Sequence, residues 1–247
     1  HYAGVACEMD TIMSIASKYN LFVIEDAAQG LMSSYKGQPL GSIGHIGCLS
    51  FHETKNYQCG EGGAILLNDE YLSQRAEIIR EKGTNRSQFI RGMIDKYRWV
   101  DVGSSYLPSE LNAAFLYAQL ETAHKVNEKR LSLWNEYLKQ LFRVSQVDLQ
   151  IMPNELRHNA HIFYIKLKDI NERQRMIEYL KSYKIQSVFH YIPLHKSRKC
   201  SKYNYFHGED RFTTKESERL LRLPIYYDLE IADVKYICSK VKGFFND

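Results

Sequence analysis

The chain has 247 residues, of which 44% are hydrophobic and 25% are charged, a balance that excludes disordered, collagen-like and low-complexity proteins. Lys and Arg number 33 against 29 Asp and Glu, and the resulting net charge of +4 gives little support to a nucleic-acid-binding protein. No apolar run approaches the ~20 residues of a membrane-spanning helix and no signal sequence opens the chain, so we expect neither a membrane protein nor a secreted one.

Short apolar runs alternate with helical patterns in the first half of the chain. Apolar residues recur at the spacing of one helix face over residues 8–20, and the run 21–24 is apolar on both faces, as in a buried parallel strand. Two further strands and a helix that stops at a glycine are predicted at residues 47–51, 64–67 and 72–83. This alternation predicts an α/β layer.

A long helical pattern runs from Pro108 to Leu141 and predicts a spine between two domains. Beyond it, strands, helices, a possible capping box and a closing helix are predicted at 161–165, 176–180, 187–190, 213–216 and 231–241. These elements indicate a smaller α+β domain. We therefore expect a large domain over residues 1–125 and a small C-terminal domain over residues 126–247.

The cysteines are scattered and contain no Cys-x-x-Cys pair. They are Cys7, Cys48, Cys59, Cys200 and Cys238. Disulfide scaffolds and zinc ribbons need paired spacings, so we expect free structural thiols and a reducing, cytoplasmic location.

Polar residues follow two of the predicted strands, at the edge where open α/β sheets bind ligands. A partly desolvated lysine can condense with an aldehyde, which is how pyridoxal phosphate (PLP) is anchored, and a carboxylate can keep the pyridine nitrogen of PLP protonated. Lys55 and Asp26 fit these two roles. Gln29 could donate a hydrogen bond to the phenolate oxygen of the ring, and Ser50 could bind the phosphate.

Each of these residues also has a purely structural interpretation. Asp26 could cap a helix or form a turn, Lys55 could be a solvated surface lysine, and Ser50 could be a small core residue. The joint pattern favours a cofactor site, whereas no single residue does.

Three segments resemble, in order and spacing, the core motifs of the DegT-type sugar aminotransferases. They read Glu-Asp-Ala-Ala-Gln at 25–29, Ser-Phe-His-Glu-Thr-Lys-Asn at 50–56 and Gly-Glu-Gly-Gly at 60–63, and the resemblance continues at 189–195 and 214–220. It implies a type I, aspartate-aminotransferase-like PLP fold that is N-terminally incomplete here, together with the smaller C-terminal domain. It also implies the roles given above for Lys55, Asp26, Gln29 and Ser50.

The resemblance further implies an activity and partners. We expect glutamate, which leaves as 2-oxoglutarate, to aminate a dTDP-4-keto-6-deoxy sugar and give a dTDP-4-amino-4,6-dideoxyhexose. Related sugar dehydratases have His in place of the lysine, so Lys55 favours transamination. The family's shared active site predicts a homodimer, and we expect neither a nucleic-acid partner nor a membrane.

Two departures from the family pattern matter for this expectation. Ser105 stands where many relatives have an Asn that reaches the phosphate of the neighbouring subunit, and a serine can still donate that hydrogen bond. The glycine-rich phosphate loop and the aromatic residue that stacks on PLP precede the equivalent of His1 in relatives. Losing several charge-assisted hydrogen bonds of roughly 1.5–3 kcal/mol each would weaken PLP binding, so a non-catalytic folded fragment remains the alternative.

Other clusters are weaker. His190 and His195 are candidate substrate-side residues, although core or loop histidines explain them equally well. The stretch 158–161 contains two histidines without a third convergent ligand, so we expect no metal site. The basic and aromatic stretch 196–206 suits a solvated loop near a nucleotide sugar as well as a nucleic-acid surface.

Overall fold

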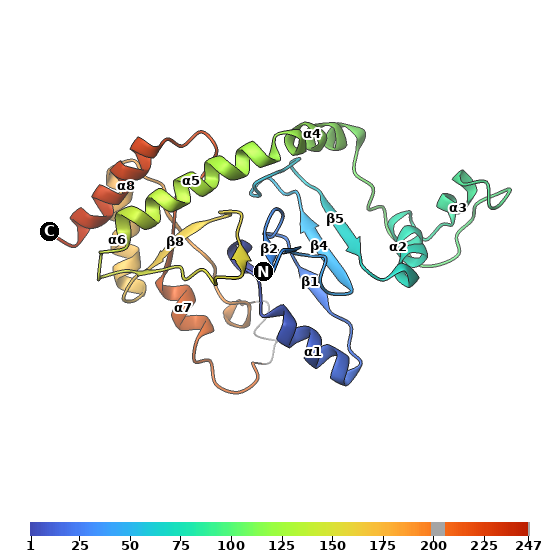
Figure 1. The fold of residues 1–247 in the computed structure, drawn as a ribbon, viewed down its shortest axis with the longest axis horizontal. Coiled ribbons are helices and arrows are strands. Elements are labelled where there is room, and N and C mark those ends of the chain that lie inside the picture. Colours follow the sequence, from blue (N-terminus) through green and yellow to red (C-terminus); the bar gives the residue numbers. More distant parts are fainter. Residues whose placement is uncertain (199–205, 247) are drawn as a thin grey trace. The chain divides into compact units, whose positions relative to one another are not determined.

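The computed structural model describes residues 1–198 and 206–246, and Figure 1 shows the order of their helices and strands. The chain divides into two compact units. The first unit comprises residues 1–125 and 154–159, and the second comprises residues 126–153 and the described residues from 160 onward. The chain therefore returns once to the first unit after it has entered the second, which the sequence did not predict.

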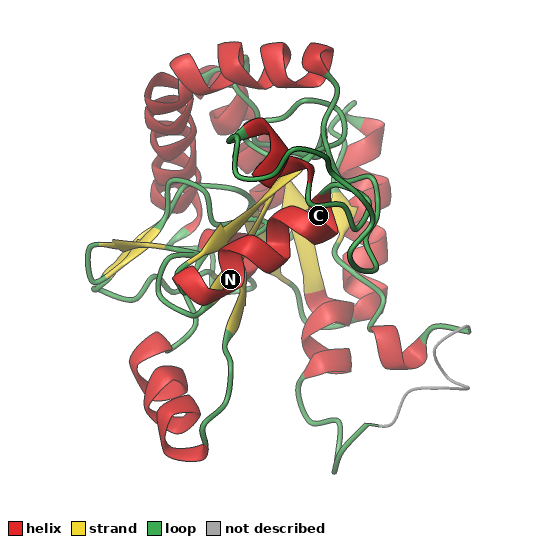
Figure 2. Cartoon of the chain, turned by 90° about the vertical axis from the view of Figure 1, so that its right-hand side faces the viewer, coloured by secondary structure: helices red, strands yellow, loops and turns green. Residues whose placement is uncertain are grey.

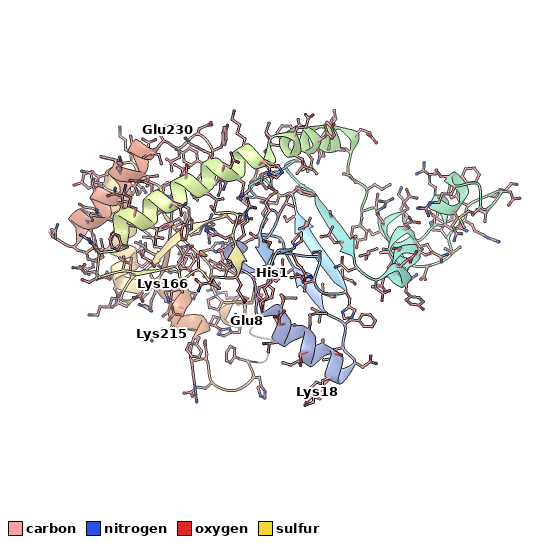
Figure 3. The ribbon with its side chains drawn as sticks, in the orientation of Figure 1. His1, Glu8, Lys18, Lys166, Lys215 and Glu230 are labelled. Atoms are coloured by element: carbon pink, nitrogen blue, oxygen red, sulfur yellow. The ribbon has the colours of Figure 1, made fainter. Side chains whose placement is uncertain are left out.

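Helix α1 (Met9–Tyr19) follows a short 3-10 turn, η1 (Tyr2–Gly4), and confirms the helix predicted over residues 8–20. Its buried residues are Met9 and Ala16, which share one face of the helix. Glu8 and Lys18 lie at its opposite ends, where their charges complement the helix dipole (Figure 3).

A three-stranded sheet in the order β1-β4-β5 supports the predicted site. Its strands are β1 (Ile24–Asp26), β4 (Ile46–Ser50) and β5 (Gly63–Leu67). Strand β1 runs parallel to β4, as expected, and β5 runs antiparallel to β4.

The strand predicted over residues 21–24 is wrong in its bounds and in its burial. Pairing starts only at Ile24, while Leu21 and Phe22 lie outside the strand and are exposed. The residues of β1 alternate between exposed and buried, so only one of its faces is covered. Ile24 and Asp26 point to the exposed face and Glu25 to the buried one, as strand alternation requires.

A second small sheet explains why residues 154–159 belong to the first unit. Strand β7 (Leu156–Arg157) pairs antiparallel with β2 (Ser34–Tyr35), which also pairs with β3 (Gln38–Pro39). The backbone N–H of Lys36 also donates to the carbonyl of Glu155 at 2.9 Å. These contacts bring a segment from beyond residue 150 beside the loop that follows β1.

The single long helix predicted from Pro108 to Leu141 is wrong, because two helices stand in its place. Helix α4 (Glu110–Glu121) ends at Thr122, whose hydroxyl donates to the carbonyl of Gln119 at 3.2 Å, and α5 (Ala123–Leu141) begins directly after it. The preceding helices of the first unit are η2 (Glu70–Leu72), α2 (Ser73–Arg80) and α3 (Arg86–Ile90).

The second unit packs helices against an antiparallel sheet in the order β6-β8-β10-β9, of which Figure 1 labels β8 beside α5, α6 and α8. Figure 2 shows the whole chain with its helices in red and its strands in yellow. Its strands are β6 (Asp148–Leu149), β8 (Phe163–Lys166), β9 (Val188–Phe189) and β10 (Leu220–Leu223), and its further helices are α6 (Ile170–Ser182), η3 (Leu194–Lys196), α7 (Thr213–Arg219) and α8 (Ile231–Phe244). In the core, Tyr137 of α5 stacks on Phe163 at 4.7 Å, and Trp134 meets the same ring edge-on at 5.5 Å.

The capping box predicted at Thr213 and Glu216 is wrong. The N-cap of α7 makes no side-chain hydrogen bond, and Glu216 forms an ion pair at 2.8 Å with Lys166 instead. A capping box does occur at α8, where Glu230 and Asp233 bond each other's backbone N–H groups; Figure 3 marks Glu230 at the start of that helix.

The cysteines in the described part of the chain are free thiols, namely Cys7, Cys48, Cys59 and Cys238, whereas Cys200 lies outside it. None of the described helices is long and apolar enough to cross a membrane.

Candidate active site

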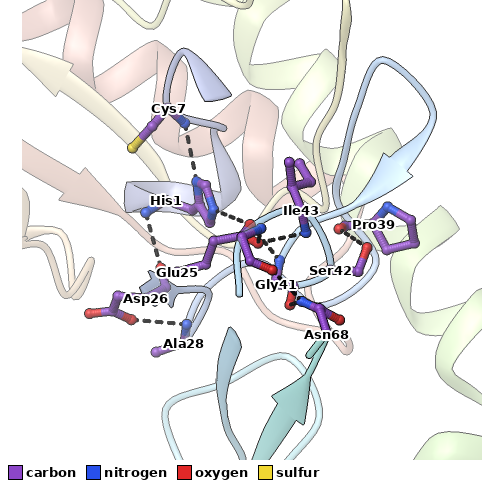
Figure 4. Close-up of polar contacts among 11 residues, drawn as sticks. His1, Cys7, Glu25, Asp26, Ala28, Pro39, Gly41, Ser42, Ile43 and Asn68 are labelled. Atoms are coloured by element: carbon purple, nitrogen blue, oxygen red, sulfur yellow. Dashed lines mark hydrogen bonds and ion pairs between the residues drawn. The ribbon is translucent and has the colours of Figure 1, made fainter. Parts of the chain in front are cut away.

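Glu25 and Asp26 are consecutive residues at the carboxyl end of β1, and they do different work. Glu25 is 3% exposed, and its Oε1 accepts hydrogen bonds from the backbone N–H groups of Ile43 and Gly44 at 2.7 and 2.5 Å (Figure 4). Its Oε2 accepts from the N–H of Gly41 at 2.8 Å and contacts His1 Nε2 at 2.9 Å. The Glu25 carboxylate therefore fastens the loop 41–44 to the strand. Sequence reasoning missed this role, because strand alternation indicates only that two adjacent carboxylates point to opposite faces.

Asp26 presents its carboxylate on the exposed face of the strand. Its Oδ1 accepts a hydrogen bond from the N–H of Ala28 at 3.1 Å, which forms a turn, and its carbonyl accepts from the amine of His1 at 3.1 Å (Figure 4). The turn-forming interpretation of Asp26 thus has support, while its cofactor role stays a prediction with which an exposed carboxylate is compatible.

Gln29 lies in the loop after β1, and its side-chain amide has a defined orientation. The backbone N–H of Ala3 donates to Gln29 Oε1 at 2.6 Å. Because the oxygen is occupied in this way, the donor nitrogen Nε2 points elsewhere. A donor of this kind suits the phenolate oxygen of PLP.

Ser50 is the last residue of strand β4, and Lys55 lies in the loop that follows it. Asp26 is paired with Cys48, so the carboxyl ends of β1 and β4 lie at the same edge of the sheet. Ser50 Oγ accepts from the N–H of His52 at 3.3 Å, which leaves the hydroxyl hydrogen to donate. Lys55 is half-buried, in a turn closed by a bond of 2.9 Å from its N–H to the carbonyl of His52.

The glycine-rich segment 60–63 closes the loop that carries the lysine. Phe51 and Glu53 donate their N–H groups to the carbonyls of Gly62 and Gly60, both at 2.8 Å. Gly60 has φ +78°, which favours glycine, so the segment has a backbone reason for its composition. The loop is thereby a defined hairpin-like turn at the edge of the sheet.

Asn159 is a further residue at this edge that sequence reasoning did not assign to the site. It is 2% exposed, and its Nδ2 donates to the carbonyls of Gln29 and Leu31, both at 2.8 Å. Its own carbonyl accepts from Asn56 Nδ2 at 3.0 Å. The sequence contained no signal for this role, because the residue arrives from a segment more than 100 positions away.

The residues at this edge fit PLP. An exposed carboxylate (Asp26) matches the pyridine nitrogen, an amide donor (Gln29) matches the phenolate, and a half-buried amine (Lys55) matches the aldehyde. The hydroxyl of Ser50 retains a hydrogen for a phosphate oxygen.

Ser105 lies apart from this group, beside the end of α2. It forms an isolated antiparallel bridge with Glu81, and the neighbouring carbonyl of Ser104 accepts from the N–H of Lys82 at 3.0 Å. Its side chain is exposed. The role of Ser105 at the phosphate of a neighbouring subunit stays a prediction.

His190 and His195 belong to the second unit. His190 is buried directly after β9, and its ring lies 3.5 Å from that of Tyr191. His195 Nε2 contacts Asp210 Oδ2 at 2.9 Å. A hydrogen bond from Thr214, together with His195, holds the pKa of Asp210 below its ordinary range. His195 is thus engaged in a local cluster.

Metal ligands do not converge in residues 1–198 and 206–246, where no group of three or more His, Cys, Asp or Glu could hold an ion. His158 is largely buried, and this burial lowers the pKa of its ring. Of the basic and aromatic stretch 196–206, residues 199–205 lie outside the described part of the chain.

An α/β unit with a lysine and a carboxylate at the carboxyl edge of its parallel strands has the arrangement of a PLP-dependent aminotransferase. A match to the DegT/DnrJ/EryC1/StrS aminotransferase family spans residues 1–242, and the chain belongs to this family. The family and the fold class predicted from the motifs are thereby confirmed, and the cofactor of this family is PLP.

Relatives and solved structures agree with this assignment. The chain is 31% identical over 255 residues to the uncharacterized protein MJ1066 of Methanocaldococcus jannaschii, and covers 100% of itself and 66% of that protein. It is similar to DesV of S. venezuelae, with 25% identity, a TM-score of 0.89 and coverage of 100% and 64%. It is also similar to a DegT DnrJ EryC1 StrS aminotransferase from Brucella abortus, with 26% identity and a TM-score of 0.85. That match covers 100% of this chain and 63% of the other. The chain thus spans slightly less than two thirds of the length of these relatives.

Proposed function

We propose that this protein is a PLP-dependent aminotransferase of nucleotide-linked ketosugars. The observation that carries the proposal is the pairing of β1 with β4, which puts Asp26 and the Lys55 loop at one edge of the sheet. The oriented amide of Gln29 and membership of the aminotransferase family support it.

Each residue has a defined task in this proposal. When bound, PLP supplies an aldehyde and an electron sink. Lys55 would hold that aldehyde through its amine, and the same amine would serve as the base that moves a proton at the reacting carbon of the amino acid. Asp26 holds a proton at the pyridine nitrogen, Gln29 donates to the phenolate, and Ser50 donates to the phosphate.

We further propose a dTDP-4-keto-6-deoxy sugar as amino acceptor and glutamate as donor. Segments 51–57, 80–87 and 206–211 resemble the dTDP-4-amino-4,6-dideoxygalactose transaminases of enterobacterial common antigen synthesis, which supports this substrate. His190 and His195 are the candidate contacts to the sugar nucleotide.

The proposed enzyme is a cytoplasmic homodimer with a shared active site. Residues 1–125 would belong to the large cofactor-binding domain and residues 126–247 to the small one. The two compact units support this division except at residues 154–159, which belong to the first unit. The exposure of helix α4 supports the proposal that this helix contacts a partner subunit. None of its residues is buried, and the exposed fractions of Leu111 and Tyr117 are 83% and 69%. Ser105 would contact the phosphate bound by the partner subunit.

Borohydride trapping tests the proposal. The complete protein is incubated with PLP, reduced and digested, and we expect a phosphopyridoxyl group on Lys55. Lys55→Ala should abolish the adduct and lower the transamination rate by about 10³-fold or more, while Lys36→Ala, at an exposed lysine paired with Asp10, should change neither. An unmodified Lys55 in the complete protein would refute the proposal. An adduct there, but none on the 247-residue chain alone, would identify this chain as the non-catalytic fragment.

A further inference from the structure

Asn159 occupies a central place in the first unit. Its side chain is buried, and its Nδ2 spans the carbonyls of Gln29 and Leu31 at 2.8 Å each. The side-chain oxygen faces Gly4 so closely that a Cβ on that glycine would lie 2.1 Å from Oδ1. The side chain thus fills the space between the turn η1 and the loop after β1.

The backbone of the same residue reaches the loop that carries the lysine. Its carbonyl accepts from the side chain of Asn56, the residue next to Lys55, at 3.0 Å. The turn η1 in turn donates the N–H of Ala3 to Gln29 Oε1. Three segments that are remote in sequence therefore meet at Asn159: the η1 turn, the Gln29 loop and the Lys55 loop.

We propose that Asn159 is a positioning residue for cofactor binding, which sets the orientation of the Gln29 amide and its separation from Lys55. In this role Asn159 would contact neither substrate nor cofactor. It acts by fixing the carbonyls on both sides of residue 30, so that Gln29 can keep its oxygen on Ala3 and direct its nitrogen to the ring oxygen of PLP. The inference rests on the proposed function, since it assigns a consequence for the cofactor.

Two control residues separate this role from a contribution to folding alone. Asn68 makes a similar pair of bonds, from Nδ2 to the carbonyls of Gly41 and Gly44 at 3.1 and 2.8 Å. These bonds lie in the loop 41–44, which donates hydrogen bonds to Glu25. Its side chain is more exposed than that of Asn159. Asn127 matches the burial of Asn159, at 2%, and lies in the second unit. Asn68→Ala thus controls for the bonds, and Asn127→Ala for the burial.

The experiment measures PLP affinity, the pH titration of the absorbance of bound PLP, and the urea midpoint of the complete protein. For Asn159→Ala we expect PLP to bind about tenfold or more weakly, because the loss of two hydrogen bonds frees the Gln29 loop. The absorbance titration should shift to higher pH, since a donor to the phenolate favours its deprotonated form. Asn68→Ala and Asn127→Ala should lower the urea midpoint without moving either cofactor signal.

Asn159→Asp is the second variant, in case the alanine variant does not fold. Its ionised carboxylate would face two carbonyls without a donor, whereas the protonated form restores one hydrogen bond. PLP affinity relative to wild type should therefore recover as the pH is lowered. If wild type binds PLP but the Asn159 variants match the controls in affinity and absorbance, the positioning role is wrong. If wild type binds no PLP, the proposed function itself fails.

Discussion

Glu25 and Asp26 allow fold and chemistry to be separated by two isosteric substitutions on adjacent residues. Glu25→Gln changes a buried carboxylate that accepts three backbone N–H bonds, and Asp26→Asn changes an exposed one that accepts a single turn bond. We expect the first substitution to lower stability and the second to lower catalysis.

The magnitude follows from the bonds at Glu25. A glutamine can keep its oxygen towards Ile43 and Gly44, but its amide hydrogens then face the N–H of Gly41, and a buried donor without an acceptor costs about 1–3 kcal/mol. The two retained bonds lose the assistance of the charge, which adds about 0.5–1 kcal/mol each. Together the substitution should cost about 2–5 kcal/mol. Asp26→Asn keeps an acceptor for the N–H of Ala28 and should cost less than about 0.5 kcal/mol.

Amide hydrogen exchange is the appropriate assay, because it reports on the loop itself. In Glu25→Gln the amides of Gly41, Ile43 and Gly44 should exchange about 30- to 4,000-fold faster where they exchange through opening of this loop, as a cost of about 2–5 kcal/mol implies. Asp26→Asn should leave their exchange unchanged and reduce transamination with glutamate by about 10²-fold or more, since the ring nitrogen loses its partner. Unchanged exchange in Glu25→Gln, or a larger effect in Asp26→Asn, would refute this division.

Three further substitutions test other parts of the structure by urea unfolding. Gly4→Ala should cost about 2–4 kcal/mol, because φ is +77° and the new Cβ would overlap Asn159; an unchanged midpoint would contradict that packing. Tyr137→Phe removes a hydrogen bond of 2.7 Å to the carbonyl of Pro224 and should lower the free energy of unfolding by about 1 kcal/mol. Because burial raises the pKa of the Tyr137 phenol, wild type should also show one more non-titrating tyrosine than the variant in alkaline difference spectra. Hydrogen bonds from backbone N–H groups at the start of α6 lower the pKa of Asp169. The stability that Asp169 contributes to the protein is therefore complete above the ordinary carboxyl pKa and is lost as the pH falls through the lowered value. Asp169→Ala should remove this part of the pH dependence of unfolding, and an acid profile identical to that of wild type would refute the reasoning.

The elements that the sequence predicted well are those whose burial repeats along the chain. Helices α1, α6 and α8 each carry apolar residues at helical spacing, and the buried residues Met9, Met176 and Val234 lie on the expected faces. Strand β7 has two residues and no period to detect. Its pairing with β2 depends on contacts across more than 100 residues, so local patterns could not predict that residues 154–159 return to the first unit.

The candidate site divides in the same way. Cofactor roles could be predicted for Asp26, Gln29, Ser50 and Lys55 because these residues follow strand ends in an order that resembles the motifs of a known family. Asn159 was missed, because its bonds to the Gln29 loop and to Asn56 exist only after the chain has folded back. Glu25 was inside a recognised motif, yet its acceptors serve backbone N–H groups, which no side-chain pattern in the loop 41–44 reveals.

The hydrogen bonds from the loop 41–44 to Glu25 also affect the position of Asp26. Strand β1 has only three residues, so these bonds help to define its register. Glu25 is paired with Gly47 of β4, where a Cβ would lie 2.1 Å from the carbonyl oxygen of Gly41. The loop 41–44 can therefore approach β4 this closely only at a glycine. A slip of one residue would exchange the faces of Glu25 and Asp26 and bury the carboxylate assigned to the cofactor. In this register the N–H groups of the loop donate to the buried Glu25 carboxylate. Glu25 therefore fixes the face on which the Asp26 carboxylate is presented.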